Sequence, residues 1–198
     1  LARGFKLTSA QEANLTGCVA LCQGRYSEAA DMLGRYVGLE GWDVMTVWLC
    51  ALAEYHAGRF AAASQSAERL LRYRPRPAVL VLLASARNEL ADNAGALKAF
   101  EAALKIAPDD LDALEGRGRL QIEGGRLQNG IADLSEVIRR DPARASAHFG
   151  RALAYRREYR YEESEQDIDE AIRLAPDRPE AYFFRGRNWK AKGQWAEA

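Results

Sequence analysis

The chain has 198 residues, and its 28 Lys and Arg residues balance its 28 Asp and Glu residues, so the formal net charge is zero. This balance argues against a nucleic-acid-binding protein that attracts phosphate through an overall positive field, and 48% hydrophobic with 28% charged residues argues against a wholly disordered chain. Apolar runs such as 79–84 are too short to span a bilayer, and three cysteines form no disulfide framework. We therefore expect a protein without a membrane span, in a reducing, cytoplasmic compartment; abundant Ala and a preference for Arg over Lys indicate a GC-rich bacterial source.

Prolines and glycines mark a repeat of about 34 residues. The prolines that follow one another at intervals of 33, 34 and 34 residues are Pro75, Pro108, Pro142 and Pro176. Three of these prolines follow amphipathic runs with helical spacing, at 94–106, 131–140 and 168–174. The glycines that keep the same period are Gly24, Gly58, Gly125 and Gly193. This repetition, without period-two alternation, predicts stacked pairs of antiparallel helices and no sheet.

In chain order, we expect a lead segment at 1–9 and then about eleven helices in five complete repeats and the start of a sixth. The predicted repeats span 10–43, 44–76, 77–110, 111–144, 145–178 and, in part, 179–198. The last predicted helix, 181–191, carries four aromatic residues with no complete partner helix after it: Tyr182, Phe183, Phe184 and Trp189. We therefore expect that a further helix follows in a longer parent chain, or that another molecule covers this end, including a second copy that associates end to end.

Large, small and aromatic residues recur at fixed positions within each repeat. Repeat five carries them as His148, Arg151, Ala152, Tyr155, Tyr161, Ser164, Ile168, Ala171 and Pro176, and repeat three as Leu80, Leu83, Ala84, Ala96, Phe100, Ala103 and Pro108. From residue 10 onward this register resembles the tetratricopeptide repeat (TPR) family. The resemblance implies an all-α fold, an α-solenoid of helix pairs wound as a right-handed superhelix, and a non-catalytic scaffold that binds other proteins.

Three positions depart from the family pattern. Gly130 stands near the start of the second helix of repeat four, where Ala is usual, and Ala91 and Tyr159 replace the turn glycine. We expect the turns at Ala91 and Tyr159 to differ in shape from the glycine turns.

Repeats four and five also share a charged pair. Arg117 and Arg151 stand where repeat three has Leu83, and Asp133 and Asp167 stand in the middle of the second helices. Because the two residue types arrive together, we predict ion pairs Arg117–Asp133 and Arg151–Asp167 between helices, with a structural and not a ligand-binding role.

Patterns for catalysis or metal binding are sparse. Neither His56 nor His148 has a carboxylate or cysteine at ligand spacing, and packing explains His148. Cys18 and Cys22 lie one helical turn apart, but no second Cys/His pair follows. The acidic run at 162–170 is typical of a solvated helix face, apart from Asp167. We therefore predict no enzyme activity, no cofactor and no metal.

The resemblance implies that the first helix of each pair lines a concave groove that binds a peptide or helix of a partner protein. Transferred position by position, the groove residues are Asn14, Cys18, Met45, Trp48, Leu52, Tyr55, Val81, Ser85, Asn88, Glu115, Arg119, Phe149, Arg156, Phe183, Arg187 and Lys190, with Gln11, Asp112, Ile122 and Leu153 beside them. The N-terminal part is apolar, which suits side-chain anchors, and the C-terminal part gathers Arg and Lys, which suit carboxylates. The family's clamp for Hsp70 and Hsp90 tails is not expected, because Cys18, Leu49, Ala78 and Leu82 stand at four of its five positions.

Two alternatives remain open beside the scaffold. The chain is the recognition module of a larger enzyme if a catalytic domain lies outside it. It is a nucleic-acid-associated repeat protein if the Tyr- and Arg-rich stretch 155–161 stacks bases and holds phosphates, although the zero net charge makes this a minor hypothesis.

Overall fold

The computed structural model describes residues 8–39, 43–73 and 75–193, so the predicted lead segment and the end of the partial repeat lie largely outside the described residues. The chain divides into two compact units, Leu1–Pro108 and Asp109–Ala198, called here the N-terminal unit and the C-terminal unit. In the described residues every regular element is a helix, as predicted.

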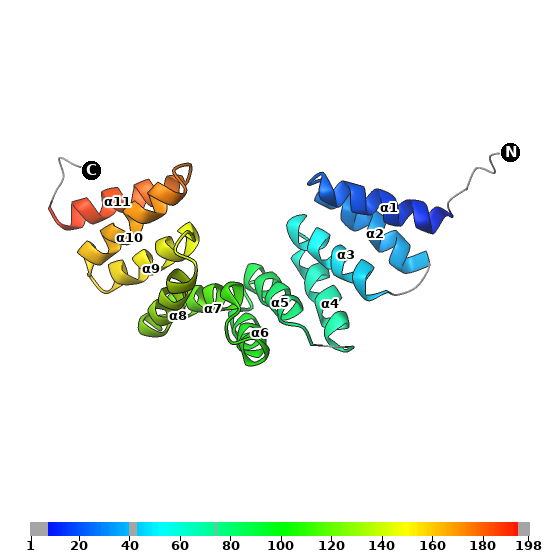
Figure 1. Ribbon diagram of the computed structural model, residues 1–198, viewed down its shortest axis with the longest axis horizontal. Coiled ribbons are helices and arrows are strands. Elements are labelled where there is room, and N and C mark those ends of the chain that lie inside the picture. Colours follow the sequence, from blue (N-terminus) through cyan, green and yellow to red (C-terminus); the bar gives the residue numbers. More distant parts are fainter. Residues whose placement is uncertain (1–7, 40–42, 74, 194–198) are drawn as a thin grey trace. The chain divides into compact units, whose positions relative to one another are not determined.

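The N-terminal unit is a series of six helices (Figure 1, dark blue to green). They are α1 (Ser9–Cys22), α2 (Tyr26–Leu39), α3 (Val44–His56), α4 (Phe60–Leu71), α5 (Pro77–Glu89) and α6 (Asn93–Ile106). Each helix packs against the next, and the first helices of successive pairs also meet, α1 with α3 and α3 with α5.

The C-terminal unit continues the pattern with five helices (Figure 1, green to red). They are α7 (Leu111–Glu123), α8 (Leu127–Arg140), α9 (Ala145–Arg157), α10 (Tyr161–Leu174) and α11 (Pro179–Ala191). Consecutive helices pack together, and α7 also meets α9. In both units, therefore, the apolar face of one helix pair is buried by the next pair, which is how a repeat protein builds a continuous core.

Side chains just before several first helices fix where those helices begin. Thr8 and Gln11 form a capping box, in which the Thr8 hydroxyl accepts from the Gln11 N–H at 3.2 Å and the Gln11 side chain accepts from the Thr8 N–H at 3.0 Å. The carboxylates of Asp43 and Asp110 cap α3 and α7 in a similar way. Pro179 occupies the first turn of α11, so this helix begins two residues before the predicted start.

The turn between the two helices of a pair has one conformation throughout the described chain. Gly24, Gly58 and Gly125 have φ values of 72°, 75° and 80°, and the non-glycine residues Ala91 and Tyr159 have φ values of 60° and 62°. In each of these turns, the backbone N–H of the residue that follows donates a hydrogen bond to the carbonyl five residues before it. For example, the Arg160 N–H donates to the Tyr155 carbonyl at 3.0 Å. The prediction that the turns at Ala91 and Tyr159 differ in shape was therefore wrong. The turn between the two helices requires a residue with a positive φ. At Ala91 and Tyr159 a non-glycine residue adopts this left-handed conformation at a cost in energy.

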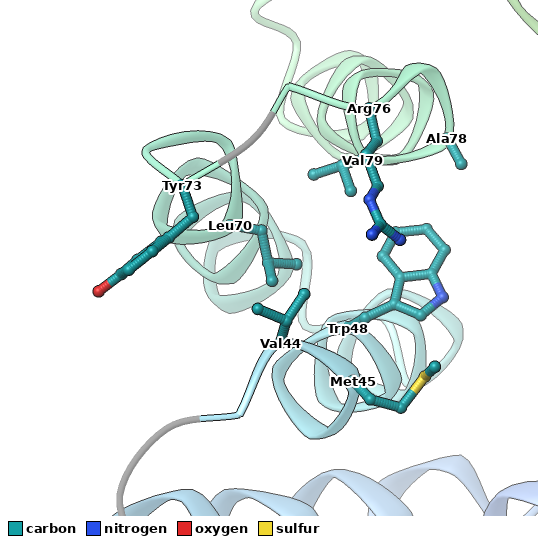
Figure 2. Close-up of a pocket in the computed structure, with 8 residues that line it drawn as sticks. All are labelled: Val44, Met45, Trp48, Leu70, Tyr73, Arg76, Ala78 and Val79. Carbon is teal, nitrogen blue, oxygen red and sulfur yellow. The ribbon is translucent and has the colours of Figure 1, made fainter.

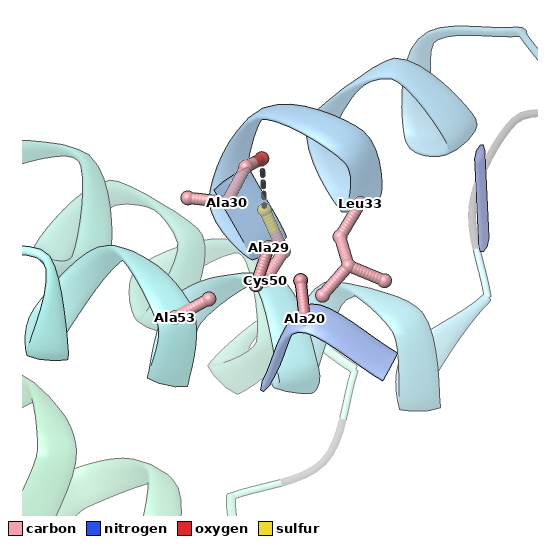
Figure 3. Packing of buried hydrophobic residues seen from close by; sticks show 6 residues of the cluster. All are labelled: Ala20, Ala29, Ala30, Leu33, Cys50 and Ala53. Atoms are coloured by element: carbon pink, nitrogen blue, oxygen red, sulfur yellow. Dashed lines mark hydrogen bonds between the residues drawn. The ribbon is translucent and has the colours of Figure 1, made fainter. Parts of the chain in front are cut away.

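Small side chains let the helices of the N-terminal unit approach closely. The cluster shown in Figure 3 contains one large aliphatic side chain, and its members are Ala20, Ala29, Ala30, Leu33, Cys50 and Ala53. Gly17 lies directly over Leu33, where an added Cβ would come within 2.7 Å of Leu33 Cγ. The contact between α1 and α2 thus depends on glycine at residue 17.

A similar contact explains the departure at Gly130. A Cβ at Gly130 would lie 2.6 Å from the Gly118 carbonyl oxygen and would collide with the Ile122 side chain. A Cβ at Gly118 would in turn lie 3.2 Å from the Gly130 oxygen. Helices α7 and α8 therefore cross with their backbones too close for the usual Ala at residue 130.

Two bidentate ion pairs join the helices of the C-terminal unit. Arg117 donates through Nε and Nη2 to the Asp133 carboxylate at 2.7 Å each, and Arg151 donates to the Asp167 carboxylate at 2.7 and 2.8 Å. The ring of His148 joins the second pair, with Nδ1 3.1 Å from Asp167 and Nε2 3.1 Å from the Pro142 carbonyl. His148 is thus buried in a polar network as well as packed, which the sequence pattern did not indicate.

Repeat two holds a different polar contact at the corresponding positions. Cys50 stands where repeats four and five have Arg, and Ser66 stands where they have Asp. The Glu54 carboxylate links the two, because it accepts from the Ser66 hydroxyl at 2.8 Å and lies 3.6 Å from Cys50 Sγ. Burial raises the pKa of Glu54, although the Ser66 hydrogen bond opposes the shift, and burial also raises the pKa of the Cys50 thiol, to about 12.

Candidate functional site

The N-terminal unit carries an open apolar pocket of about 520 Å³, called here the N-terminal pocket. Three helices form it: the start of α3, the end of α4 and the start of α5. Its lining residues are Val44, Met45, Trp48, Leu70, Tyr73, Arg76, Ala78 and Val79. Figure 2 shows Val44, Leu70 and Val79 pointing toward one another, while Trp48 and Arg76 extend toward each other at one side.

Several large side chains of the N-terminal pocket face solvent. Met45 is 63% exposed and Tyr73 is 67% exposed, and the Val44 side chain of the same pocket is 44% exposed. Among the described lining residues, Arg76 alone carries a formal charge. A concave apolar surface of this kind suits an apolar side chain of a ligand, with a cation at the rim to fix its orientation.

Two of the predicted groove residues, Met45 and Trp48, lie in this pocket. Sequence reasoning missed Leu70 and Tyr73 because it considered first helices alone, whereas Leu70 comes from a second helix and Tyr73 follows that helix. Val44, Ala78 and Val79 do lie on first helices, but not at the positions transferred from the family. The remaining predicted residues of this unit lie outside the pocket, half-buried on first helices: Asn14, Cys18, Leu52, Tyr55, Val81, Ser85 and Asn88. Gln11 is exposed on α1.

The C-terminal unit carries a second pocket, of about 410 Å³ and mixed polarity, called here the C-terminal pocket. It is lined by Arg119, Ile122, Glu123, Ser146, Phe149, Gly150, Leu153, Arg157, Arg178 and Glu180. Four of these residues were expected from the sequence, namely Arg119, Ile122, Phe149 and Leu153. Helices α7, α9 and α11 all contribute, so three successive first helices share this surface.

Beside the C-terminal pocket, three phenylalanine rings and two arginine side chains pack together. Phe184 packs edge-on against Phe149 and Phe183, with ring centroids 5.7 and 5.4 Å apart. The Arg156 guanidinium lies 5.6 Å from the centroid of the Phe184 ring, and the Arg187 guanidinium lies 6.0 Å from the same centroid. We call Arg156 and Arg187 the arginine pair. Both were predicted groove residues, and the Arg187 guanidinium also lies 5.7 Å from the centroid of the Phe183 ring.

Other predicted residues of this unit are engaged within the protein. The Glu115 carboxylate accepts from Arg144 at 3.0 Å, and Asp112 lies 2.8 Å from the same guanidinium. Lys190 is exposed on α11. The predicted stacking residue Tyr155 has arginines over its ring, with Arg160 at 4.3 Å from the centroid and Arg151 at 5.7 Å. The chain's own cations therefore cover one of the three tyrosine rings in the stretch 155–161, whereas the Tyr159 side chain is 79% exposed.

The acidic run 162–170 is less uniform than predicted. Asp167 is buried in its ion pair, as expected, but Glu165 accepts from Lys192 at 2.7 Å and from the Trp189 indole at 2.5 Å. These bonds tie α11 to α10. They also give Trp189 a packed position, so the exposed aromatic residues of α11 are Tyr182 and Phe183.

The described residues bring together no group of three or more His, Cys, Asp or Glu side chains that could hold a metal ion. Cys18 is half-buried and Cys22 is exposed, on the same helix. Among the described helices, none combines the length and the apolar character that a membrane crossing requires.

Solved structures share this fold over most of the chain. A tetratricopeptide repeat protein from Parabacteroides merdae is 21% identical, with a TM-score of 0.77, and the alignment covers 96% of this chain and 75% of that one. MamA from Desulfovibrio magneticus is 18% identical, with a TM-score of 0.74 and coverage of 87% and 98%. YrrB, described as a TPR protein with an unusual peptide-binding site, is 17% identical, with a TM-score of 0.68 and coverage of 89% and 91%.

Sequence comparison identifies the family. Over 59 residues the chain is 32% identical to the BBSome complex member bbs-4 of Caenorhabditis elegans, a match that covers 30% of this chain and only 13% of that protein. The sequence model of the tetratricopeptide repeat matches residues 49–111, 81–145 and 116–179, which together make up about two thirds of the chain. The chain belongs to the tetratricopeptide repeat family.

Proposed function

We propose that the chain binds a segment of a partner protein along its first helices, and that the N-terminal pocket receives a large apolar side chain of that segment. The family and the fold are those of a protein–protein interaction scaffold. Two of the similar proteins support the proposal by description, since YrrB has a peptide-binding site and bbs-4 is a member of a complex.

The observation that carries this proposal is the exposed apolar lining of the N-terminal pocket. Met45 and Tyr73 leave more than half of their surface in water beside a cavity of about 520 Å³. Burying one Leu, Met or Phe side chain of a ligand there contributes about 1.5–3 kcal/mol. The half-buried Trp48 supplies a rigid wall, and large aromatic residues of this kind are frequent hot spots of interfaces.

Peptide selection tests the proposal without a known partner. The whole chain is used to select peptides from a displayed random library, and synthetic copies of the selected peptides are then titrated by fluorescence anisotropy. We expect an apolar anchor common to the selected peptides. Replacing Met45 by Glu should weaken their binding about tenfold or more, because the substitution places a charge where about 1.4 kcal/mol or more of apolar contact was gained. Trp48→Ala should weaken binding in the same direction.

A matched control is available in the same unit. Ile106 is also an exposed apolar residue, at the end of α6 and outside the pocket, so Ile106→Glu introduces the same charge without touching the pocket. We expect this variant to bind like the parent chain. If Met45→Glu and Trp48→Ala both bind the selected peptides as the parent does, while circular dichroism shows normal helix content, the pocket is not the binding site.

A further inference from the structure

Arg156 and Arg187 of the C-terminal unit have no counter-charge in contact with them among the described residues, in contrast to the arginines of the ion pairs between helices. Arg117, Arg144 and Arg151 each reach a carboxylate at 2.7 to 3.0 Å. For the arginine pair, Arg156 and Arg187, no carboxylate of the described residues lies within 4 Å, and their recorded contacts are with the phenylalanine rings. The two guanidinium groups therefore carry unneutralised charge on the same face of the unit.

The position of Arg156 makes this lack of a partner costly. Its Nε is buried, and no acceptor among the described residues lies within hydrogen-bond distance of it. Burial lowers the pKa of Arg156, and the positive charge of Arg187 lowers this pKa further. A donor left without an acceptor and two like charges at one ring both favour a bound anion, which removes the two costs together.

We propose that the arginine pair binds a carboxylate group, supplied by Asp or Glu side chains of the partner segment; this inference rests on the proposed function. Arginine and carboxylate form planar, bidentate hydrogen bonds that are stronger than neutral ones. Phe183 is 60% exposed beside the pair and offers apolar contact to a neighbouring ligand residue. The preferred ligand is therefore an acidic residue next to an apolar one.

The C-terminal pocket is the less favourable place for the same anion. Arg119 and Arg178 line that pocket together with Glu123 and Glu180, whose carboxylates already supply negative charge. No carboxylate of the described residues lies within 4 Å of the arginine pair. A carboxylate gains more by reaching Arg156 and Arg187, because there it faces two cations that are not in contact with another carboxylate.

The test uses two synthetic peptides with a fluorescein label, one with the repeated sequence Leu-Glu-Glu-Leu and one with Leu-Gln-Gln-Leu. Both are titrated with the whole chain in chloride buffer, and binding is followed by anisotropy. We expect the Glu peptide to bind about tenfold more tightly than the Gln peptide, and the double variant Arg156→Gln, Arg187→Gln to lose that preference, since two charge-assisted contacts are removed.

The control variant makes the same change in net charge elsewhere in the unit. Arg139 and Arg173 are highly exposed on the second helices α8 and α10, where each pairs with a Glu three residues before it. The double variant Arg139→Gln, Arg173→Gln should keep the preference for the Glu peptide. If this control loses the preference as well, the binding reflects overall charge and the site proposal fails.

Two further results would overturn the proposal. One is a double variant of the arginine pair that still prefers the Glu peptide while retaining parental helix content. The other is a phosphoserine peptide that binds through the pair when the Glu peptide does not, which would assign the site to a phosphate group. Neither result affects the proposed function, because that proposal is tested by Met45 and Trp48 in the other unit.

Discussion

The ion pair between Arg117 and Asp133 predicts a marked asymmetry between the two single substitutions. The Asp133 side chain is 12% exposed and accepts two hydrogen bonds of 2.7 Å from Arg117, whose side chain is 26% exposed. Replacing Arg117 by Leu leaves a buried carboxylate without that partner and should destabilise the unit by about 3 kcal/mol, at the lower end of the range for buried pairs. Replacing Asp133 by Ala should cost only about 1–2 kcal/mol, because the longer Arg side chain can reach water.

The double variant is the decisive one. Repeat three already has Leu83 and Ala99 at these two positions, both buried and without a polar partner. The variant Arg117→Leu, Asp133→Ala should therefore recover to within about 1 kcal/mol of the parent, which gives a coupling free energy of about 3–5 kcal/mol.

Urea unfolding followed by circular dichroism gives the overall ranking of the four proteins. Repeat proteins often unfold in more than one step, so native-state hydrogen exchange of the amides of α7 and α8 should supply the local free energies. The reasoning is refuted if Arg117→Leu costs less than Asp133→Ala, or if the double variant is as unstable as Arg117→Leu alone.

Three further substitutions test the turns, the helix crossing and the buried carboxylate. Tyr159→Gly should raise the free energy of unfolding by about 0.5–1 kcal/mol, because glycine adopts the left-handed conformation without strain; a loss of stability in urea unfolding would contradict this. Gly130→Ala should lower it by about 1–3 kcal/mol, because the new methyl group collides with Ile122, whereas an unchanged urea midpoint would show that the crossing has room. Burial raises the pKa of Glu54 in the folded state above its value in the unfolded chain. The protonated Glu54 side chain therefore contributes fully to the free energy of unfolding at pH values below the unfolded-state pKa, and this contribution is lost as pH rises through the folded-state pKa. Glu54→Gln should therefore stabilise the chain more at pH 7 than near pH 4, and equal effects in urea unfolding at the two pH values would refute the assignment.

The candidate site was only partly accessible from the sequence. The resemblance to the TPR family assigns the groove to first helices, so Met45, Trp48, Phe149 and Arg156 were named by transfer from their positions in the repeat. The lining by Leu70, Tyr73 and Arg178 was missed, because these residues come from the end of a second helix or from connections between repeats. Which connection lies beside which first helix depends on how consecutive pairs stack, and no local pattern encodes that geometry.

The repeat period by itself determined the helices, their order and the residues that turn the chain, because proline, glycine and apolar spacing act on the local backbone. The tertiary structure alone decided which turns need a left-handed residue regardless of its type, as at Tyr159, and why Gly130 replaces Ala. It also decided which charges are neutralised: Arg151 pairs with Asp167, whereas Arg156, five residues later, lies over a phenylalanine ring with no carboxylate of the described residues within 4 Å. Charge pairing and backbone clearance depend on distances between helices, and the packing of whole helix pairs sets those distances.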